Sequence, residues 1–204
     1  MTSQAIRDPF ADHLITPENS AFVFIDYQPE QLATVRSMDH GLLVKNAVST
    51  VRAVKAFGVP VVHSTVNVAS GQVGPTHAEL AELLVDDPPL DRTTVNSWED
   101  TDFVEAIRVT GRQKLIFAAL WTEVCMAFAA LDALREGFEV YPVVDAIGGT
   151  SPEAHRAGLE RVVQAGGQPI GWVSLACELQ RDWARVETVP AIVEITLTDR
   201  LLAE

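Results

Sequence analysis

Short apolar runs alternate with segments of helical periodicity along most of this chain. The apolar runs predict buried strands, because a strand covered on both faces carries hydrophobic side chains at nearly every position. The periodic segments predict helices, as in 42–57, where Val44, Val48 and Val51 share one face. The expected strands are 21–26, 59–65, a weak one at 92–95, 115–120, 138–144 and 167–172. The expected helices are 42–57, 78–85, 99–109, 122–136, 152–165 and 174–184.

This alternation of strand and helix predicts an α/β fold. We expect a three-layer, doubly wound sheet, mostly parallel, with about six strands in the Rossmann-like order 3-2-1-4-5-6 and helices on both faces. The sequence contains no internal repeat, low-complexity tract or flexible linker, which indicates a single domain, 1–204, with its core at about 20–185. The apolar tail, 187–204, has no evident helix partner, so we expect it to pack on the domain or in subunit contacts.

The composition and charge of the chain limit the partners and the cellular location that can be expected. The chain has 204 residues, 48% of them hydrophobic, and a formal net charge of −13. Such a charge repels phosphate groups, so nucleic acid and anionic membranes are excluded as partners, and we expect a small-molecule substrate. The first 16 residues lack the apolar stretch of a signal peptide, and no apolar run approaches the ~20 residues that span a bilayer. Together with a count of only two cysteines, these features predict a cytoplasmic protein without disulfides.

Parallel sheets bind ligands outside the carboxyl ends of their strands. The segments expected at that edge are 26–28, 63–65, 92–98, 122–125 and Asp145. Asp26 ends an apolar strand, where a carboxylate is costly to bury unless it is paired. Burial there would raise the pKa of Asp26 and suit it to act as a general base, although the same residue could simply cap a turn.

A cysteine follows the apolar strand 115–120. Thr122 is the expected N-cap of a helix that continues to about Glu136. Cys125 then lies in the first helical turn, where unpartnered N–H groups and the helix dipole favour a thiolate, so we expect a thiol pKa below the usual ~8.5. The alternative is that Cys125 is a small buried hydrophobe. The second cysteine, Cys177, stands among apolar residues in the last predicted helix, and we expect it to be buried and inert.

Several local patterns occur together in the sequence. They are Asp26-x-Gln28 after the first strand, Asn96-Ser-Trp98, Thr122-Glu-Val-Cys125, Asp145 opening a loop into a helix with His155, and Ala176-Cys-Glu-Leu-Gln-Arg-Asp-Trp183. With these motifs, 21–185 resembles the isochorismatase-like cysteine hydrolases, a family that includes nicotinamidases. The second and last patterns look like the ycaC-related branch of that family, whose substrates are poorly defined.

The resemblance implies a catalytic set of Asp26, Arg92 and Cys125. Cys125 would be the nucleophile and Asp26 the base. Arg92 stands where the wider family has a lysine, and because arginine stays charged it can orient Asp26 but cannot carry a proton. An ion pair with a neighbouring acid is the alternative for Arg92. Lys114 begins a strand at the opposite end of the sheet, which makes it a poor candidate.

The resemblance also implies an oxyanion hole. A cis peptide bond at Leu120–Trp121 would turn the Trp121 N–H toward the site, where it and the Cys125 N–H would bind the oxyanion. Candidate substrate-binding residues are Gln28, Asn96 and Trp98, and Trp98 could equally fill core space.

A metal site is not expected. His63 and His77 invite one, but no aspartate stands two residues before His63, and two histidines alone are too few ligands. We therefore expect neither a metal nor another cofactor.

Two classes of function remain open. The first is hydrolysis of a small amide or related C–N bond through a thioester on Cys125. The second is a catalytically weak scaffold or reactive-thiol protein that keeps the fold while Arg92 replaces the lysine. A dinucleotide-binding protein is excluded, because Asp26-Tyr-Gln-Pro-Glu follows the first strand where a glycine-rich loop would be needed. The resemblance further implies a homo-oligomer larger than a dimer, with octamers in the ycaC-related branch.

Overall fold

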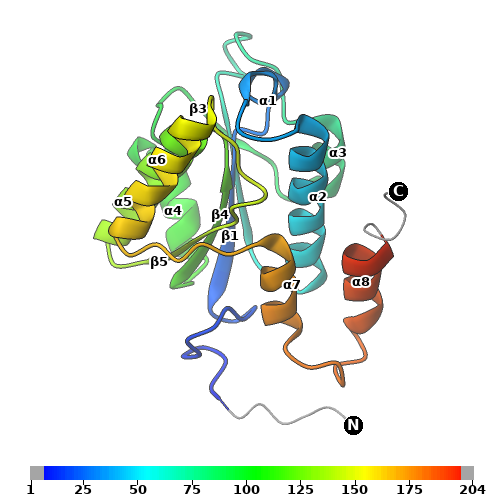
Figure 1. The fold of residues 1–204 in the computed structure, drawn as a ribbon. Helices are drawn as coiled ribbons and strands as arrows, with labels where there is room; N and C mark the ends of the chain where they lie inside the picture. Colours follow the sequence, from blue (N-terminus) through cyan, green and yellow to red (C-terminus); the bar gives the residue numbers. More distant parts are fainter. Residues whose placement is uncertain (1–6, 199–204) are drawn as a thin grey trace.

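The strands form one parallel sheet with β1 at its centre. A computed structural model describes residues 7–198, and in this part of the chain the strand order is β3-β2-β1-β4-β5 (Figure 1). Every neighbouring pair of strands is parallel. The strands are β1 (Ser20–Ile25), β2 (Val61–Val66), β3 (Leu90–Arg92), β4 (Lys114–Ala119) and β5 (Glu139–Pro142).

Helices connect the strands and cover both faces of the sheet. Figure 1 shows α2, α7 and α8 on one side and α4, α5 and α6 on the other. The α-helices are α1 (Pro29–Thr34), α2 (His40–Ala56), α3 (Ala78–Leu83), α4 (Thr101–Val109), α5 (Ala127–Arg135), α6 (Pro152–Gln164), α7 (Trp172–Gln180) and α8 (Val189–Val193). The shorter turns are a 3-10 helix, η1 (Ser97–Glu99), and two π-helical turns, η2 (Thr122–Met126) and η3 (Glu194–Thr198).

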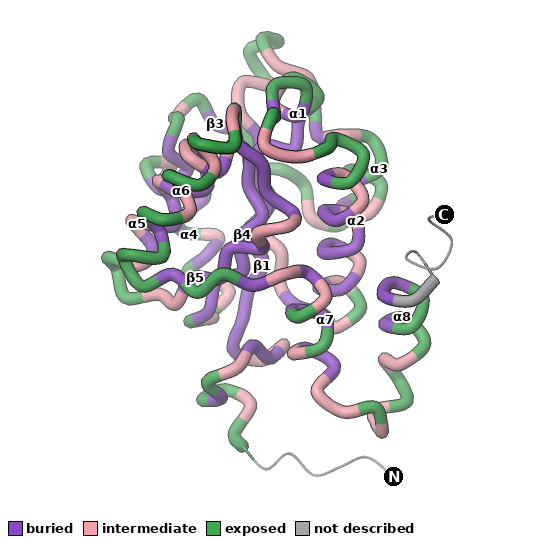
Figure 2. Tube along the Cα trace, in the orientation of Figure 1, coloured by how far each residue is buried: buried purple, intermediate pink, exposed green. Residues whose placement is uncertain are grey.

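The sheet separates two hydrophobic cores. Side chains alternate along β1, so Phe22 and Phe24 pack with residues of α2 and α7, while Val23 and Ile25 pack with residues of α4 and α5. Figure 2 shows the central strands buried along their length, whereas the helices around them are buried only in part. This three-layer arrangement confirms the predicted α/β class.

The predicted sixth strand, 167–172, is wrong. This segment runs beside β5 but makes only one isolated bridge, between Ile170 and Val143, the residue that follows β5. A regular ladder would next need a hydrogen bond from the residue at position 142 to the carbonyl of Gln168. That residue is Pro142, which has no N–H, so pairing cannot extend and the sheet stops at five strands.

Several predicted boundaries also differ from the structure. The weak strand expected at 92–95 lies at Leu90–Arg92, and the last predicted helix, 174–184, is α7 at Trp172–Gln180. Arg181 ends α7 because its φ of 60° is not helical. The helix expected over 122–136 is divided into the π-helical turn η2 and α5.

The described part of the tail packs on its own domain. Ile192 of α8 is buried beside Ala53 of α2 and Ala176 of α7. Glu194 of η3 forms an ion pair with Arg52 of α2. Residues 199–204 of the predicted tail lie outside the described residues, and the role of the tail in subunit contacts stays a prediction. Within 7–198 no helix is both long and apolar enough to cross a membrane.

Candidate active site

Asp26 lies directly after the central strand. Its backbone has a φ of 61°, in the left-handed region that aspartate tolerates better than most residues, and its N–H donates to the carbonyl of Ser64 in β2. The side chain is completely buried. Such backbone conformations often occur at functional sites, where the surrounding structure holds them in place.

Arg92, the last residue of β3, reaches across β2 to Asp26. Its Nη2 donates to Asp26 Oδ2 over 2.7 Å, and its Nη1 donates to the Thr94 carbonyl over 2.6 Å. Both side chains of the ion pair are buried, with 1% and 0% exposure. Burial raises the pKa of the Asp26 carboxyl, and the positive charge of Arg92 partly offsets that rise. Asp26 Oδ1 accepts no hydrogen bond from an N–H or hydroxyl group of the described residues, so it remains available to a third partner.

Cys125 lies close enough to Asp26 for each group to shift the pKa of the other. The residue is 7% exposed. Burial is the largest effect on the thiol and the Asp26 charge the next; together they raise the pKa of Cys125 to about 12, although Arg92 opposes them. The expectation of a lowered thiol pKa is therefore wrong. Loss of water and the adjacent carboxylate outweigh the partial charges of a helix first turn.

Thr122 does not cap the helix as predicted. Trp121 occupies the N-cap position without a side-chain cap, and η2 begins at Thr122. The Thr122 hydroxyl instead forms a 2.8 Å hydrogen bond with Nδ1 of His155 in α6. Sequence reasoning missed this contact between distant residues. A glycine in the middle of α6, Gly158, was the available signal, since a helix interior rarely contains glycine without a close neighbour.

The turn before Cys125 contains a backbone donor that has no hydrogen-bond partner in the described residues. The Leu120–Trp121 peptide bond is cis. The indole Nε1 of Trp121 donates to Thr34 Oγ1 and to the Gln31 carbonyl, which fixes the ring against α1. The Trp121 backbone N–H makes no hydrogen bond within residues 7–198. It is thus free to bind an oxygen atom of a ligand.

The proposed substrate-binding residues have structural partners instead. Both N–H groups of the Gln28 amide donate to the carbonyls of Val66 and Gly74, and its oxygen accepts from the Val66 N–H, so Gln28 secures the chain after β2. Asn96 donates to Asp132 of α5. In the described residues both side chains thus have structural partners, and their assignment to substrate binding stays a prediction.

Trp98 fills the core rather than a binding pocket. Its ring packs edge-on against Phe103 and Phe138, and its Nε1 donates to Glu136 at the end of α5 over 2.9 Å. The indole is 8% exposed. Of the two interpretations of Trp98 that the sequence left open, the structure favours core packing.

Lys114 and Cys177, the lysine and the second cysteine considered from the sequence, lie away from Asp26. Lys114 begins β4 at the amino end of the sheet, where its Nζ contacts Glu139 and the Tyr141 hydroxyl. Cys177 is exposed, so the prediction that it is buried is wrong. The buried stripe of α7 runs through Trp172, Leu175, Ala176 and Leu179, and Cys177 falls on the opposite side of the helix.

No metal ligand set is evident in the described part of the chain. His63 has both ring nitrogens engaged, Nε2 with Thr76 Oγ1 and Nδ1 with the Asp87 carbonyl. No group of three or more histidine, cysteine or acidic side chains within residues 7–198 is placed to hold an ion. His63 would have to give up a protein partner to bind a metal.

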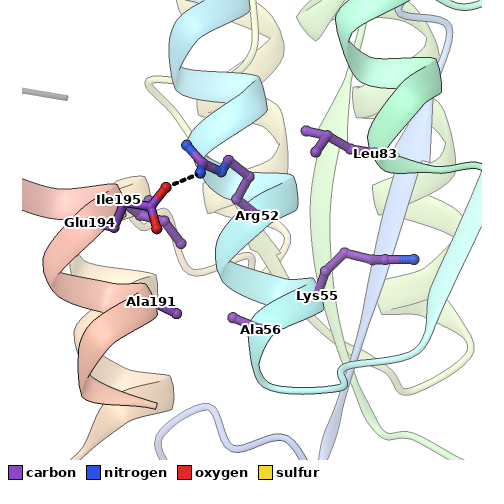
Figure 3. A pocket seen from close by; sticks show the side chains of 7 residues that line it. All are labelled: Arg52, Lys55, Ala56, Leu83, Ala191, Glu194 and Ile195. Carbon is purple, nitrogen blue, oxygen red and sulfur yellow. Dashed lines mark hydrogen bonds and ion pairs between the residues drawn. The ribbon is translucent and has the colours of Figure 1, made fainter. Parts of the chain in front are cut away.

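A pocket of about 260 Å³ lies elsewhere, between α2, α3 and the α8–η3 segment (Figure 3). Its walls are Arg52, Lys55, Ala56, Leu83, Ala191, Glu194 and Ile195. Arg52 pairs with Glu194 and Lys55 pairs with Asp87, so carboxylates already neutralise both cations. The pocket adjoins the last turns of α2, whereas Asp26 and Cys125 lie at the carboxyl ends of the strands. It is not part of the Asp26 site.

Comparison with known proteins places this geometry in a family. The isochorismatase domain model matches residues 20–174. A probable hydrolase, YcaC of Escherichia coli (strain K12), is 36% identical over 166 residues, which cover 81% of this chain and 79% of that protein.

Two solved structures share the fold over almost their whole length. YcaC from Pseudomonas aeruginosa, determined with hexane-2,5-diol and covalent acrylamide, has 33% identity and a TM-score of 0.86, covering 94% of this chain and 96% of its own. The Escherichia coli ycaC product, described as an octameric hydrolase of unknown specificity, has 32% identity and a TM-score of 0.85, covering 92% and 93%. From the match of 20–174 and these relatives, the chain belongs to the isochorismatase family and is a hydrolase.

Proposed function

We propose that this protein is a cysteine hydrolase that cleaves a small amide or related C–N bond. The observation that carries the proposal is the position of Asp26, which is paired with Arg92 and lies near enough to Cys125 to shift its pKa, in a site almost closed to water. A carboxylate between a fixed cation and a thiol can take the thiol proton when the thiol attacks. The free N–H of Trp121 supports the same proposal, since it adjoins the turn that carries Cys125.

The first half of the reaction forms a thioester. Cys125 Sγ bonds to the substrate carbonyl carbon while the thiol proton moves to Asp26. The Trp121 and Cys125 N–H groups stabilise the oxyanion. Asp26 then gives its proton to the leaving nitrogen, the C–N bond breaks, and the amine departs.

The second half returns the enzyme to its starting state. Water attacks the thioester carbon and gives a proton to Asp26. The tetrahedral intermediate collapses, the C–S bond breaks, and Asp26 returns the proton to Cys125 as the acid product leaves. Arg92 holds Asp26 in place through its 2.7 Å hydrogen bond and keeps its own proton throughout. The raised thiol pKa fits this scheme, because the proton leaves only as the new bond forms.

We expect Asp26→Asn to make the Cys125 thiol more reactive toward acrylamide while it abolishes hydrolysis. Asparagine removes the negative charge that raises the pKa of Cys125 and leaves Arg92 beside the thiol, so the thiolate forms more readily. Acrylamide adds to a thiol when Sγ bonds to the β-carbon and the proton goes to the α-carbon, and a relative was solved with covalent acrylamide. In a Cys177→Ser background, acrylamide should modify Cys125 faster at pH 8, as measured by mass spectrometry.

The same Asp26→Asn variant should lose hydrolysis, because asparagine cannot carry protons. Ammonia release from nicotinamide, carbamoyl compounds and simple aliphatic amides gives the measurement. Slower modification by acrylamide would contradict the expected gain in thiol reactivity, and would show that base assistance by Asp26 outweighs the effect of its charge on the thiol pKa. Undiminished ammonia release would contradict the role of Asp26 as the base.

A second candidate function has one observation in its favour. A thiol with a pKa of about 12 is a weak nucleophile unless a base assists it, and Arg92 cannot act as that base. A catalytically weak scaffold is the alternative. Absence of turnover for every compound of the panel by the wild-type protein would favour it.

We also propose a homo-oligomer larger than a dimer. The octameric assembly of the Escherichia coli relative supports this, as do the exposed side chains of Phe10, Trp183 and Val186, with 68%, 60% and 65% exposure. Light scattering at micromolar concentration should therefore give a mass of several subunits. A monomer mass would contradict the proposal.

A further inference from the structure

The turn that carries Cys125 is held from the side of α6. The Thr122 N–H donates to the Gly148 carbonyl over 2.9 Å. The side chain of Glu123 accepts from both the backbone N–H and the hydroxyl of Thr150, at 3.0 and 2.6 Å. The first two residues of η2 are thus tied to the loop that leads into α6.

The backbones of α6 and η2 approach each other unusually closely. A Cβ atom on Gly158 would lie 2.6 Å from Glu123 Cα and 3.0 Å from the Thr122 carbonyl oxygen. A Cβ atom on Gly149 would lie 2.6 Å from Glu123 Oε2 and 2.8 Å from His155 Cβ. Glycine is required at both positions because backbone atoms occupy the space of a side chain at Gly158 and side-chain atoms occupy it at Gly149.

His155 lies one helical turn before Gly158 and therefore faces the same turn. Its Nδ1 shares a 2.8 Å hydrogen bond with Thr122 Oγ1. Burial lowers the pKa of His155, and the nearby Glu123 carboxylate partly offsets this. The ring is therefore mainly neutral at neutral pH, and either tautomer can make one hydrogen bond with the hydroxyl of Thr122.

The hydrogen-bond register of η2 determines where Cys125 points. In this turn the Met126 N–H donates to the Trp121 carbonyl five residues back, and the Ala127 N–H to that of Thr122. A π-helical turn contains one residue more than an α-helical turn, so relaxation to the α register would rotate Cys125 by about 100° relative to α5. The thiol would then leave the Asp26 carboxylate.

We propose that His155 is a positioning residue that anchors Thr122, the first residue of η2, and so holds the Cys125 thiol against Asp26. This inference rests on the proposed role of Cys125. In this proposal neither His155 nor Thr122 touches the substrate. Their function is to keep η2 in its π-helical hydrogen-bond register.

The test compares four variants in a Cys177→Ser background. Thr122→Val and His155→Leu remove the hydrogen bond with little change in volume, whereas Thr122→Ser and His155→Asn retain a polar group that can restore it. The measured quantity is the pH at which Cys125 ionises, followed by the ultraviolet absorbance of its thiolate. A Cys125→Ala protein serves as the blank for tyrosine ionisation.

We expect the removal variants to ionise at lower pH. In the background protein the Cys125 thiol should stay protonated until near its pKa of about 12. Once η2 relaxes, the thiol loses its contact with Asp26, and its midpoint should fall by at least about one pH unit, a tenfold change in the ionisation constant, toward the usual ~8.5 of a free thiol. Thr122→Ser and His155→Asn should restore the background midpoint. The Thr122→Val/His155→Leu double variant should shift no further than either single variant, because both break the same bond.

Gly158→Ala provides an independent check on the same turn. Alanine normally stabilises a helix relative to glycine, so any loss of structure must come from its clash with Glu123. This variant should also lower the Cys125 midpoint. Unchanged midpoints in Thr122→Val and His155→Leu, in folded protein, would overturn the inference. A failure of the proposed function can be told apart from a failure of this inference. It would appear as undiminished hydrolysis by Cys125→Ala, whatever pH is measured for ionisation of the thiol.

Discussion

Replacing Arg92 by methionine is expected to lower the free energy of unfolding by about 3–5 kcal/mol at pH 8, the usual cost of leaving one charge of a buried pair without its partner. The side chains of Arg92 and Asp26 are 1% and 0% exposed, so water cannot replace the lost guanidinium. Urea unfolding at a fixed protein concentration measures the effect, because subunit association also contributes to stability.

The loss of unfolding free energy in Arg92→Met, relative to the wild type, should become larger as pH rises. Burial already raises the pKa of Asp26 in the folded protein, and loss of Arg92 raises it further. Below the unfolded pKa of about 3.9, Asp26 is protonated in both proteins and the difference is smallest. As pH rises, the difference in stability grows between the folded pKa of Asp26 in the wild type and its higher folded pKa in the variant, because over that range only the folded variant keeps a proton that the unfolded chain has released.

A double variant gives the control for this prediction. Arg92→Met combined with Asp26→Asn removes both charges of this pair, so it should recover most of the lost stability and show little of the pH dependence that arises from Asp26. An Arg92→Met protein as stable as the wild type at pH 8 would contradict the importance of the pair.

Cys125→Ala should reduce hydrolysis by about 10³-fold or more, the scale seen when a nucleophile is removed from an enzyme. The comparison needs a compound from the amide panel that the wild type turns over. Cys177→Ser is the matched control, because Cys177 is exposed and lies on the outer side of α7. It should keep the full rate.

Mass spectrometry of a stalled reaction distinguishes the two cysteines further. An acyl group trapped by acid quenching should be found on Cys125 in the wild type and be absent from Cys125→Ala. Equal rates for wild type and Cys125→Ala would rule out the thioester route.

Local sequence rules located Asp26 and Cys125 well, because each follows an apolar strand whose end lies at the same edge of the sheet. That Arg92 lies beside them in space depends on the order of the strands in the sheet instead. Arg92 is 66 residues from Asp26 in sequence, and they meet only because β2 lies between β1 and β3. The family resemblance indicated that pairing, whereas hydrophobic periodicity alone could not.

The predictions for Thr122, Cys125 and Cys177 were wrong because each depends on a residue distant in sequence or on the angular position of the residue around its helix. The Thr122 hydroxyl is taken by His155, 33 residues away, so no local capping rule could assign it. The pKa of Cys125 depends on burial and on Asp26, neither of which a first-turn argument includes. Cys177 was judged by its apolar neighbours in sequence, but its angle around α7 places it opposite the buried stripe.

The end of the sheet beside β5 has a consequence for solubility. Ile170 hydrogen-bonds inward to β5, so its neighbour Pro169 faces away from the sheet with no N–H to offer. At the opposite edge β3 is only three residues long. A strand from another molecule therefore finds few donors in register at either edge, and we expect the folded chain to resist intermolecular β pairing and amyloid-like aggregation despite its 48% hydrophobic content.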